Sequence, residues 1–481
     1  MVPMPDGSYP DVELSHIAFG SCHSRGAVNK RLSKFNGGTD DPNSTSTIWD
    51  VINTSVQPQA FLWTGDAIYP PMKVKGDTPL EVMHEEYRKM LHNSTFGYDK
   101  FINNQHLVGG VHGVWDDHDY GGNDRGRELK QREERRDAYL DFLGVPKSDS
   151  RRHRQGLYSS IEFGSDGMIA DEKQDNLSPD RVHNNKVKVI FLDTRWHREK
   201  HCIPSVGSNR YIPYGAIVAC ITRWFTAGFD LPSNLPSICA SQKDNAVLGD
   251  EQWLWLENEL NGSTASVYIV VSSIQVLTTN PVVESWGHFA NEQAKLLRLL
   301  NNVPGLVILS GDVHHAEIST TSNLHPMRRN GAIIEVTSSG LTHSCSGPRL
   351  YGPLCQPILN LFPAHRFEGG NVNDASAPSY YTGLNFGSID FDWSKRSFEV
   401  KVHNENGEVI LSTGELEMST AAGMSTQELE SVAKCIDGHL VYFMKKMNVT
   451  GWALLVLALY CLRYYFLKPL ATRQHKYSKV D

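Results

Sequence analysis

Short apolar runs recur along the chain, and each run ends in polar residues that the interior of a strand would not tolerate. Six such runs predict strands buried on both faces: 16–22, 59–69, 107–119, 186–195, 266–277 and 305–315. Between them, four stretches have the hydrophobic spacing of helices: 79–92, 124–143, 249–260 and 289–302. Strands that alternate with helices predict a layered α/β domain.

The polar clusters follow the predicted strands, where α/β folds bind their ligands. Two later segments, 386–393 and 397–412, predict antiparallel strands with an Asn-rich turn. Beyond Leu411 the composition becomes that of a linker. We therefore expect one domain over 1–411 and a linker over 412–440.

A second kind of segment lies near the C-terminus. Residues 449–467 read VTGWALLVLALYCLRYYFL, apolar except for Thr450 and Arg463. This is close to the roughly 20 residues that cross a bilayer. The pattern predicts a juxtamembrane and transmembrane helix over 441–467 with a basic tail over 468–481. A buried core helix is the alternative.

Charge and sequence signals bear on the side of the membrane. Basic residues are in excess after the span, which favours a cytosolic tail and an extracellular or lumenal body. Six Asn-X-Ser/Thr acceptors and eight cysteines suit that side, and Cys345 and Cys355 share one short stretch. The first residues show no signal peptide. Either the start is truncated, or the protein is tail-anchored and faces the cytosol. The net charge of −8 argues against a nucleic-acid partner.

The stretch GVWDDHDYGGNDRG, residues 113–126, carries the densest group of carboxylates. Like charges repel, and a buried carboxylate must be paired, neutralised or bound to a metal. Two Gly-Asp pairs also end apolar runs, at Asp66 and at Asp312, and His314 follows the second. An Asp with a His two residues on suits a metal site, whereas a solvated turn is the simpler reading of each cluster alone.

These motifs together resemble the alkaline phosphatase D (PhoD-like) family of the calcineurin-like metallophosphoesterase superfamily. The resemblance rests on seven stretches in the family's order: FGSC (19–22), GDAIY (65–69), WDDHDYGGND (115–124), FLDTR (191–195), LGDEQWLWLENEL (248–260), SGDVHHAEI (310–318) and YYTGLNFGSIDFD (380–392). It implies a two-sheet α/β/β/α sandwich.

The resemblance also implies a metal centre of Fe(III) with Ca(II), or another divalent metal at the second site. Cys22 and Tyr69 would bind ferric iron as anions, Asp66 would bridge the metals, and Asp312 would complete the iron ligands. Asp117, in place of a common Asn, adds a hard oxygen suited to calcium. His314 is a further ligand. The family's Gly-His near the fifth strand is absent, so Ser273 or Gln275 would substitute.

For catalysis, we expect His118 to be held by a carboxylate such as Asp119 and to face the phosphoryl group. Arg195 would bind a phosphate oxygen, or else pair structurally with Asp193. We assign Asp116 no chemistry. The predicted activity is hydrolysis of phosphoric monoesters by a metal-activated hydroxide. The alternatives are a phosphodiesterase of the phospholipase-D-like kind and an inactive membrane-anchored binding ectodomain. The oligomeric state is left open.

Overall fold

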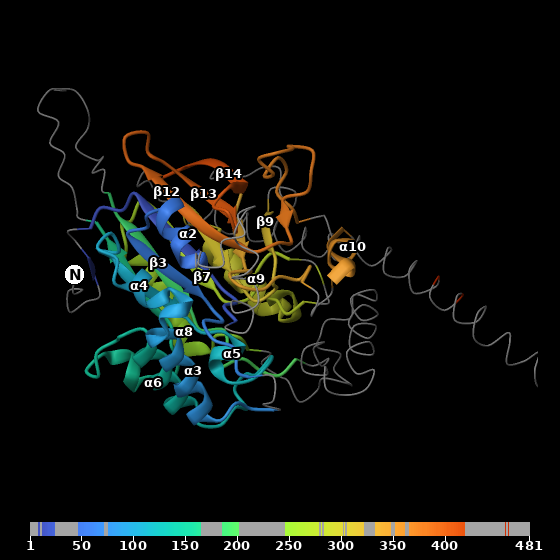
Figure 1. Ribbon diagram of the computed structural model, residues 1–481. Coiled ribbons are helices and arrows are strands. Elements are labelled where there is room, and N and C mark those ends of the chain that lie inside the picture. Colours follow the sequence, from blue (N-terminus) through green and yellow to red (C-terminus); the bar gives the residue numbers. More distant parts are fainter. Residues whose placement is uncertain are drawn as a thin grey trace, which may run out of the picture.

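Two β-sheets form the centre of the protein, as seen in the computed structural model (Figure 1). The structure describes residues 8–9, 12–24, 47–71, 76–164, 185–201, 246–278, 280, 283–301, 303, 305–321, 332–347, 352–360, 365–418, 457 and 460. Within this part of the chain the predicted mixed α/β fold with two sheets is confirmed.

The six-stranded sheet combines early and late parts of the chain. Its order is β14 (Val409–Glu417), β13 (Ser397–Asn404), β12 (Asn385–Asp392), β2 (His16–Gly20), β3 (Ala60–Thr64) and β4 (Gly110–Val114). Strands β2, β3 and β4 are parallel, and β12 joins β2 antiparallel. The three parallel strands therefore end at one edge of the sheet.

The eight-stranded sheet has a parallel centre. Its order is β1 (Ser8–Tyr9), β5 (Ser159–Phe163), β6 (Val187–Leu192), β7 (Val267–Ser272), β8 (Leu306–Ser310), β10 (Ile334–Ser338), β9 (Ala316–Thr320) and β11 (Tyr380–Tyr381). Strands β6, β7, β8 and β10 run parallel to one another. Every residue of β6, β7 and β8 is buried, as their continuous apolar runs predict.

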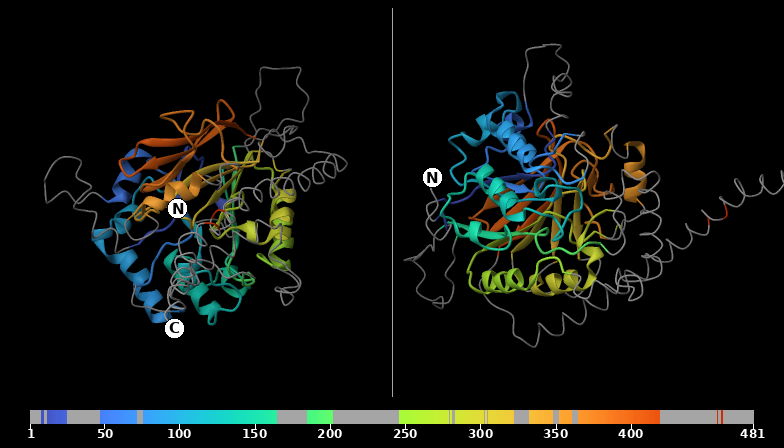
Figure 2. Two further views of the ribbon diagram at one scale, coloured as in Figure 1. Left: turned by 90° about the vertical axis from the view of Figure 1, so that its right-hand side faces the viewer. Right: turned by 90° about the horizontal axis from the view of Figure 1, so that it is seen from below.

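Helices cover the outer faces of both sheets. Trp49 of α2 (Ile48–Ser55) and Phe101 of α4 (Tyr98–Ile102) pack against Phe61 of β3. On the other sheet, α8 (Asp250–Asn261) and α9 (Ala290–Leu300) share one buried cluster with the outward residues of β6, β7 and β8. Figure 2 (right) shows α8 and α9 together along one side of the molecule.

The remaining helices are short or lie near the strand ends. They are α3 (Leu80–His92), η1 (Ser94–Phe96), α5 (Asp117–Tyr120), α6 (Arg132–Phe142), η2 (Ser150–His153), η3 (Trp286–His288), η5 (Gly352–Leu354) and α10 (Cys355–Asn360). The single turn of α5 follows β4 directly, so it presents the residues of the acidic stretch at the sheet edge.

Two predicted boundaries were wrong. The helix expected over 124–143 begins only at Arg132, because Arg198 donates hydrogen bonds to the carbonyls of Asp124 and Arg125 and Gly126 packs on the Arg198 backbone. The domain also extends beyond Leu411, since β14 stays paired with β13 as far as Glu417. Its last residues are mostly exposed at the sheet edge, so their composition resembles that of a linker.

The predicted membrane segment lies outside the described residues, except for Leu457 and Tyr460. Within the described part of the chain, no helix has both the length and the apolar character needed to cross a bilayer. The linker, transmembrane helix and basic tail therefore stay predictions.

Candidate metal centre

The predicted site residues come together because seven parallel strands end near one another. Cys22 follows β2, Asp66 and Tyr69 follow β3, and Asp117 follows β4. From the other sheet, Arg195 follows β6, and Asp312 and His314 follow β8. The strand ends thus supply these side chains from both sheets, as expected for an α/β fold.

Close packing requires the glycine of each Gly-Asp pair. A Cβ at Gly65 would lie 2.5 Å from the Asp116 Cβ, and a Cβ at Gly311 would lie 2.6 Å from the Thr64 carbonyl oxygen. The Gly-Asp pattern therefore allows the turns after β3 and β8 to approach each other, which brings Asp66 and Asp312 together.

Four carboxylates form the core of the site. Asp66, Asp116, Asp117 and Asp312 each offer an oxygen within 4.8 Å of the others. Asp66, Asp116 and Asp117 are buried. Burial and the charges of Cys22 and the neighbouring aspartates raise the pKa of Asp66 well above its usual value. Burial and the charges of Asp116, Glu284 and Asp117 do the same to the pKa of Asp312. Like charges this close disfavour ionisation unless a cation offsets them.

Cys22 and Tyr69 both contact the same Asp66 oxygen. The Tyr69 hydroxyl donates a hydrogen bond to Asp66 Oδ2 over 2.6 Å, and Cys22 Sγ lies 3.6 Å from that oxygen. Cys22 is a free, buried cysteine, and Ser339 Oγ lies 3.0 Å from its sulfur. Burial raises the pKa of both the thiol and the phenol, so each is neutral until a cation binds beside it.

His118 lies at the same place, and its predicted partner Asp119 accepts hydrogen bonds from backbone amides. The Asp119 carboxylate accepts hydrogen bonds from the backbone amides of Ala67, Ile68 and Asp116, so it fixes the turn after β3. Asp117 Oδ1 lies 3.8 Å from His118 Nε2. The His118 ring also packs on the Tyr69 ring, with centroids 4.0 Å apart.

The Arg195 side chain is buried and is paired with carboxylates of the protein. Its side chain has no exposed surface, and Nε donates to Asp116 Oδ1 over 2.7 Å. Nη1 donates to both oxygens of Glu284, each over 3.0 Å. The guanidinium is thus held between two buried carboxylates, which favours the structural alternative over phosphate binding. Its ion-pair partners are Asp116 and Glu284, whereas Asp193 accepts from the Arg195 backbone amide.

The other sequence candidates divide between the site and its surroundings. His314 is partly buried, and its ring centroid is 6.2 Å from that of Tyr69. Ser273 Oγ donates to Asp116 over 2.6 Å, so it supports a carboxylate. Gln275 donates to Thr337, away from the acidic group, so it does not substitute for the absent Gly-His.

Sequence reasoning missed three residues. Asp124 and Glu284 form a second acidic group with Asp117, again with oxygens within 4.8 Å. Asp124 was in the acidic stretch, so its charge was a usable signal, whereas Glu284 was one polar residue in an apolar segment. The third is His343, whose ring contacts those of Tyr69 and His314.

Backbone conformation marks the same residues. Among the described residues, eight other than glycine have a positive φ, and four of these were predicted as ligands: Cys22, Asp66, Asp312 and His314. Asp124 is a fifth. Such conformations cost of order 1 kcal/mol or more each and gather at functional sites. The fold therefore holds these side chains in place against a local preference.

The donor set fits metal cations. Asp116 Oδ2 and Asp117 Oδ1 are buried and accept no hydrogen bond from the described chain. Asp66, Asp117 and His118 form a further group with metal-ligand spacing. Buried carboxylate oxygens with a neighbouring imidazole are typical ligands of hard and borderline cations. The fold and the site together indicate a metal centre at the strand ends of a two-sheet α/β protein.

The comparisons with known proteins give the family. Residues 36–402 match the model of the PhoD-like phosphatase family, so the chain belongs to that family and is a phosphoric ester hydrolase. Cys22 lies before the matched residues. No curated protein gave a significant match.

Two solved structures are similar at low identity. One is a structure of PhoD, with a TM-score of 0.45 and 14% identity over 92% of this chain and 79% of that chain. Another is a purple acid phosphatase from yellow lupin (Lupinus luteus) seeds, with a TM-score of 0.40 and 11% identity over 84% of this chain and 54% of that chain.

Proposed function

We infer that the protein hydrolyses phosphate monoesters at a centre of Fe(III) and Ca(II) held by the strand-end residues. The observation that carries the proposal is the group of Asp66, Asp116, Asp117 and Asp312, three of them buried, whose oxygens lie within 4.8 Å of one another. Cys22, Tyr69, Asp66 and Asp312 would hold the iron. Asp66, Asp117 and His314 would hold the divalent metal.

When bound, such a metal pair supplies Lewis acidity and lowers the pKa of water, which makes a nucleophile at neutral pH. The chain itself does the positioning. Asp66 is fixed by the Tyr69 hydroxyl and by the His118 backbone amide, which donates to Asp66 Oδ1 over 3.3 Å. The His118 imidazole, beside the Tyr69 ring, would donate to a phosphoryl oxygen.

Arg195 has a different part in this proposal. It forms ion pairs with Asp116 and Glu284 from inside the protein, so it favours the charged form of both carboxylates at the metal centre. It is a positioning residue, and it does not touch the substrate.

The iron ligands can be tested by colour. Phenolate bound to ferric iron absorbs visible light, so the purified protein should be coloured and Tyr69→Phe should lose the band. Cys22→Ser should lose iron and activity, since a hydroxyl is a far poorer donor than a thiolate. Tyr381→Phe, which changes a half-buried tyrosine of β11, is the matched control and should keep the colour. Colourless, iron-free wild-type protein with full turnover would contradict the assignment.

A nitrophenyl monoester and a bis-nitrophenyl diester, compared side by side, would identify the preferred ester.

The proposal includes a place for the protein: anchored by one crossing at 449–467, with its body extracellular or lumenal. The disulfide between Cys345 and Cys355 supports an oxidising compartment. In a eukaryotic host, deletion from Ser431 onward should give a soluble, active enzyme. Asn261, exposed at the end of α8, should carry a glycan that Asn261→Gln removes. A body that is never glycosylated and is digested only after permeabilisation would favour the tail-anchored alternative.

A further inference from the structure

The segment after β10 runs along the segment after β2 and so reaches the metal centre. The backbone amide of Leu341 donates to the Ser21 carbonyl over 3.2 Å, and that of Thr342 donates to the Cys22 carbonyl over 3.4 Å. Ser339 Oγ lies 3.0 Å from Cys22 Sγ and accepts a hydrogen bond from the His314 amide. His343, which follows Thr342, is therefore placed beside the predicted iron ligands.

The His343 ring belongs to a group of rings around Tyr69. It meets the Tyr69 ring edge-on, with centroids 4.7 Å apart, and its centroid is 4.3 Å from that of His314. The His118 ring packs on Tyr69 as well. Tyr69, His314 and His343 are partly exposed, whereas Asp66 and Asp117 are buried. These rings therefore border the solvent side of the carboxylates, which is the side that a substrate approaches.

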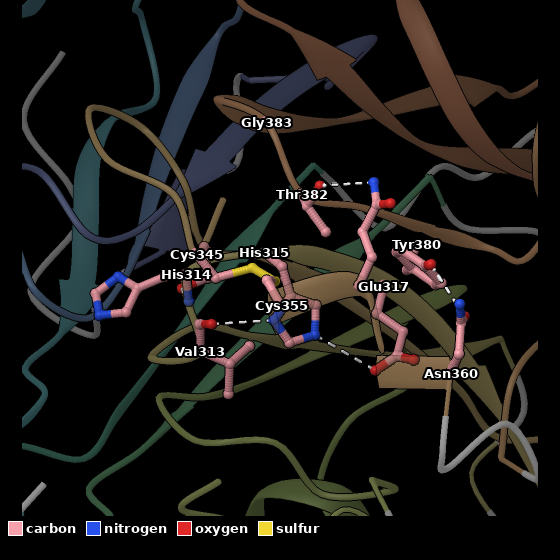
Figure 3. Close-up of a disulfide and its surroundings, with 12 residues drawn as sticks. Val313, His314, His315, Glu317, Cys345, Cys355, Asn360, Tyr380, Thr382 and Gly383 are labelled. Carbon is pink, nitrogen blue, oxygen red and sulfur yellow. Dashed lines mark hydrogen bonds and ion pairs between the residues drawn. A yellow bond between two sulfur atoms is a disulfide. The ribbon is translucent and has the colours of Figure 1, made fainter. Parts of the chain in front are cut away.

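A disulfide fixes this segment two residues after His343. Cys345 is bonded to Cys355 at the start of α10, with the two Cα atoms 5.9 Å apart (Figure 3). The Cys345 amide also donates to the His314 carbonyl over 2.7 Å. In turn, α10 is held to the following strand segment, because the Tyr380 hydroxyl donates to Asn360 Oδ1 over 3.0 Å.

The side chains of His314 and His315 face different parts of the structure. Figure 3 shows their rings pointing in opposite directions. The His315 ring faces Glu317 in the interior, with Nε2 3.7 Å from Oε2, while the His314 ring packs against His343. The crosslink therefore fixes the segment that presents His314 and His343 to the centre.

We propose that His343 is a substrate-binding residue, whose imidazole N–H donates a hydrogen bond to a phosphoryl oxygen of the ester. The Cys345–Cys355 disulfide holds it in position. The inference rests on the proposed function, because it requires phosphate esters to bind at this centre. His343 is in none of the groups with metal-ligand spacing among the described residues, so we assign its imidazole to the substrate and not to a metal. A phosphoryl group bound to metals through some of its oxygens needs hydrogen-bond donors for the others.

The test separates the donor from the ring. His343→Phe keeps an aromatic ring against Tyr69 but has no N–H, whereas His343→Gln keeps a donor. We expect His343→Phe to raise the inhibition constant of inorganic phosphate about tenfold and to lower kcat/KM about a hundredfold. His343→Gln should recover part of both. Metal content should stay at the wild-type level in each variant, which also reports folding.

Two comparisons complete the experiment. His153→Phe changes an exposed histidine of η2 and should bind phosphate like the wild type. The double variant Cys345→Ser, Cys355→Ser should weaken phosphate binding in the same direction as His343→Phe.

Wild-type phosphate affinity and turnover in His343→Phe would overturn the assignment. Loss of metal from this variant would overturn it too, because His343 would then act by holding the metal centre in place. Unchanged phosphate affinity in the double cysteine variant would overturn the part given to the disulfide. If the wild type itself neither binds phosphate nor hydrolyses its esters, the proposed function fails instead.

Discussion

Asp66→Asn is expected to lower turnover at least a hundredfold while the fold is kept. Asp66 and Asp117 are common to two groups with metal-ligand spacing, one with His118 and the other with Asp116 and Asp312. An amide has the same shape as the carboxylate, but it carries no charge to offset two cations. It is also a poor bridge between them. Loss of metal should therefore accompany loss of rate, and steady-state kinetics with metal analysis would measure both.

Asp374→Asn is the matched control for this substitution. Asp374 is exposed in a turn and accepts hydrogen bonds from Ser376, so the change should leave both turnover and metal content at wild-type values. Wild-type turnover in purified Asp66→Asn would remove this residue from the site and with it the bridging role.

Removal of the metals should make stability fall as the pH rises. In the metal-free protein, burial raises the pKa of Asp116 to about 6 and that of Asp119 to about 7, and it raises the pKa of Asp66 and Asp312 well above their usual value. When the pKa of a carboxyl group is higher in the folded than in the unfolded state, the group contributes its full stabilisation below the unfolded-state pKa. This contribution to the free energy of unfolding is lost as the pH rises through the folded-state pKa.

The loss should therefore lie between about pH 4 and pH 8, with on the order of 1 kcal/mol for each unit of raised pKa. We expect the Tm of chelator-treated protein to be at least about 5 °C lower at the upper end of this range. Metal-loaded protein should not show this fall, because protons compete with the cations for the same oxygens.

Asp66→Asn provides the internal check on this pH dependence. Without metal it lacks one of the repelling carboxylates, so its Tm at the upper end of the range should exceed that of the metal-free wild type. If the Tm of the metal-free wild type does not fall as the pH rises, the buried carboxylates do not repel one another as we infer. That result would contradict the argument for the metal centre.

Much of the fold and the site's location could be predicted from the sequence because both depend on local pattern. The runs 186–195 and 266–277 contain β6 and β7, whose residues are all buried, so their apolar character was unambiguous. The polar residues after each run had to leave the sheet at its edge. The strand-to-loop junctions therefore indicated where the ligands gather.

The partners of individual charges could not be predicted because they depend on segments far apart in the sequence. Arg195 follows β6 and comes two residues after Asp193, yet its ion-pair partners are Asp116 and Glu284, which come from other parts of the chain. His343 reaches the centre only because the segment after β10 lies along Cys22. Neither the hydrophobic periodicity of a segment nor the spacing of its motifs predicts such contacts.

Some strands were missed for a similar reason. The edge strands β1 and β11 have two residues each, and β9, which lies between β10 and β11, carries the polar residues Glu317, Ser319 and Thr320. Glu317 is tolerated there because Arg366 donates to it over 2.7 Å. Tertiary pairing thus compensates for residues that would otherwise argue against a buried strand.

The central claim is that Asp66 and the carboxylates around it are held together by bound cations. Elemental analysis of the purified full-length protein, with wild type and Asp66→Asn measured side by side, tests it most directly. The account predicts iron together with a divalent metal in the wild type, and a loss of both in the variant. Wild-type protein that is fully active yet contains no bound metal would contradict it.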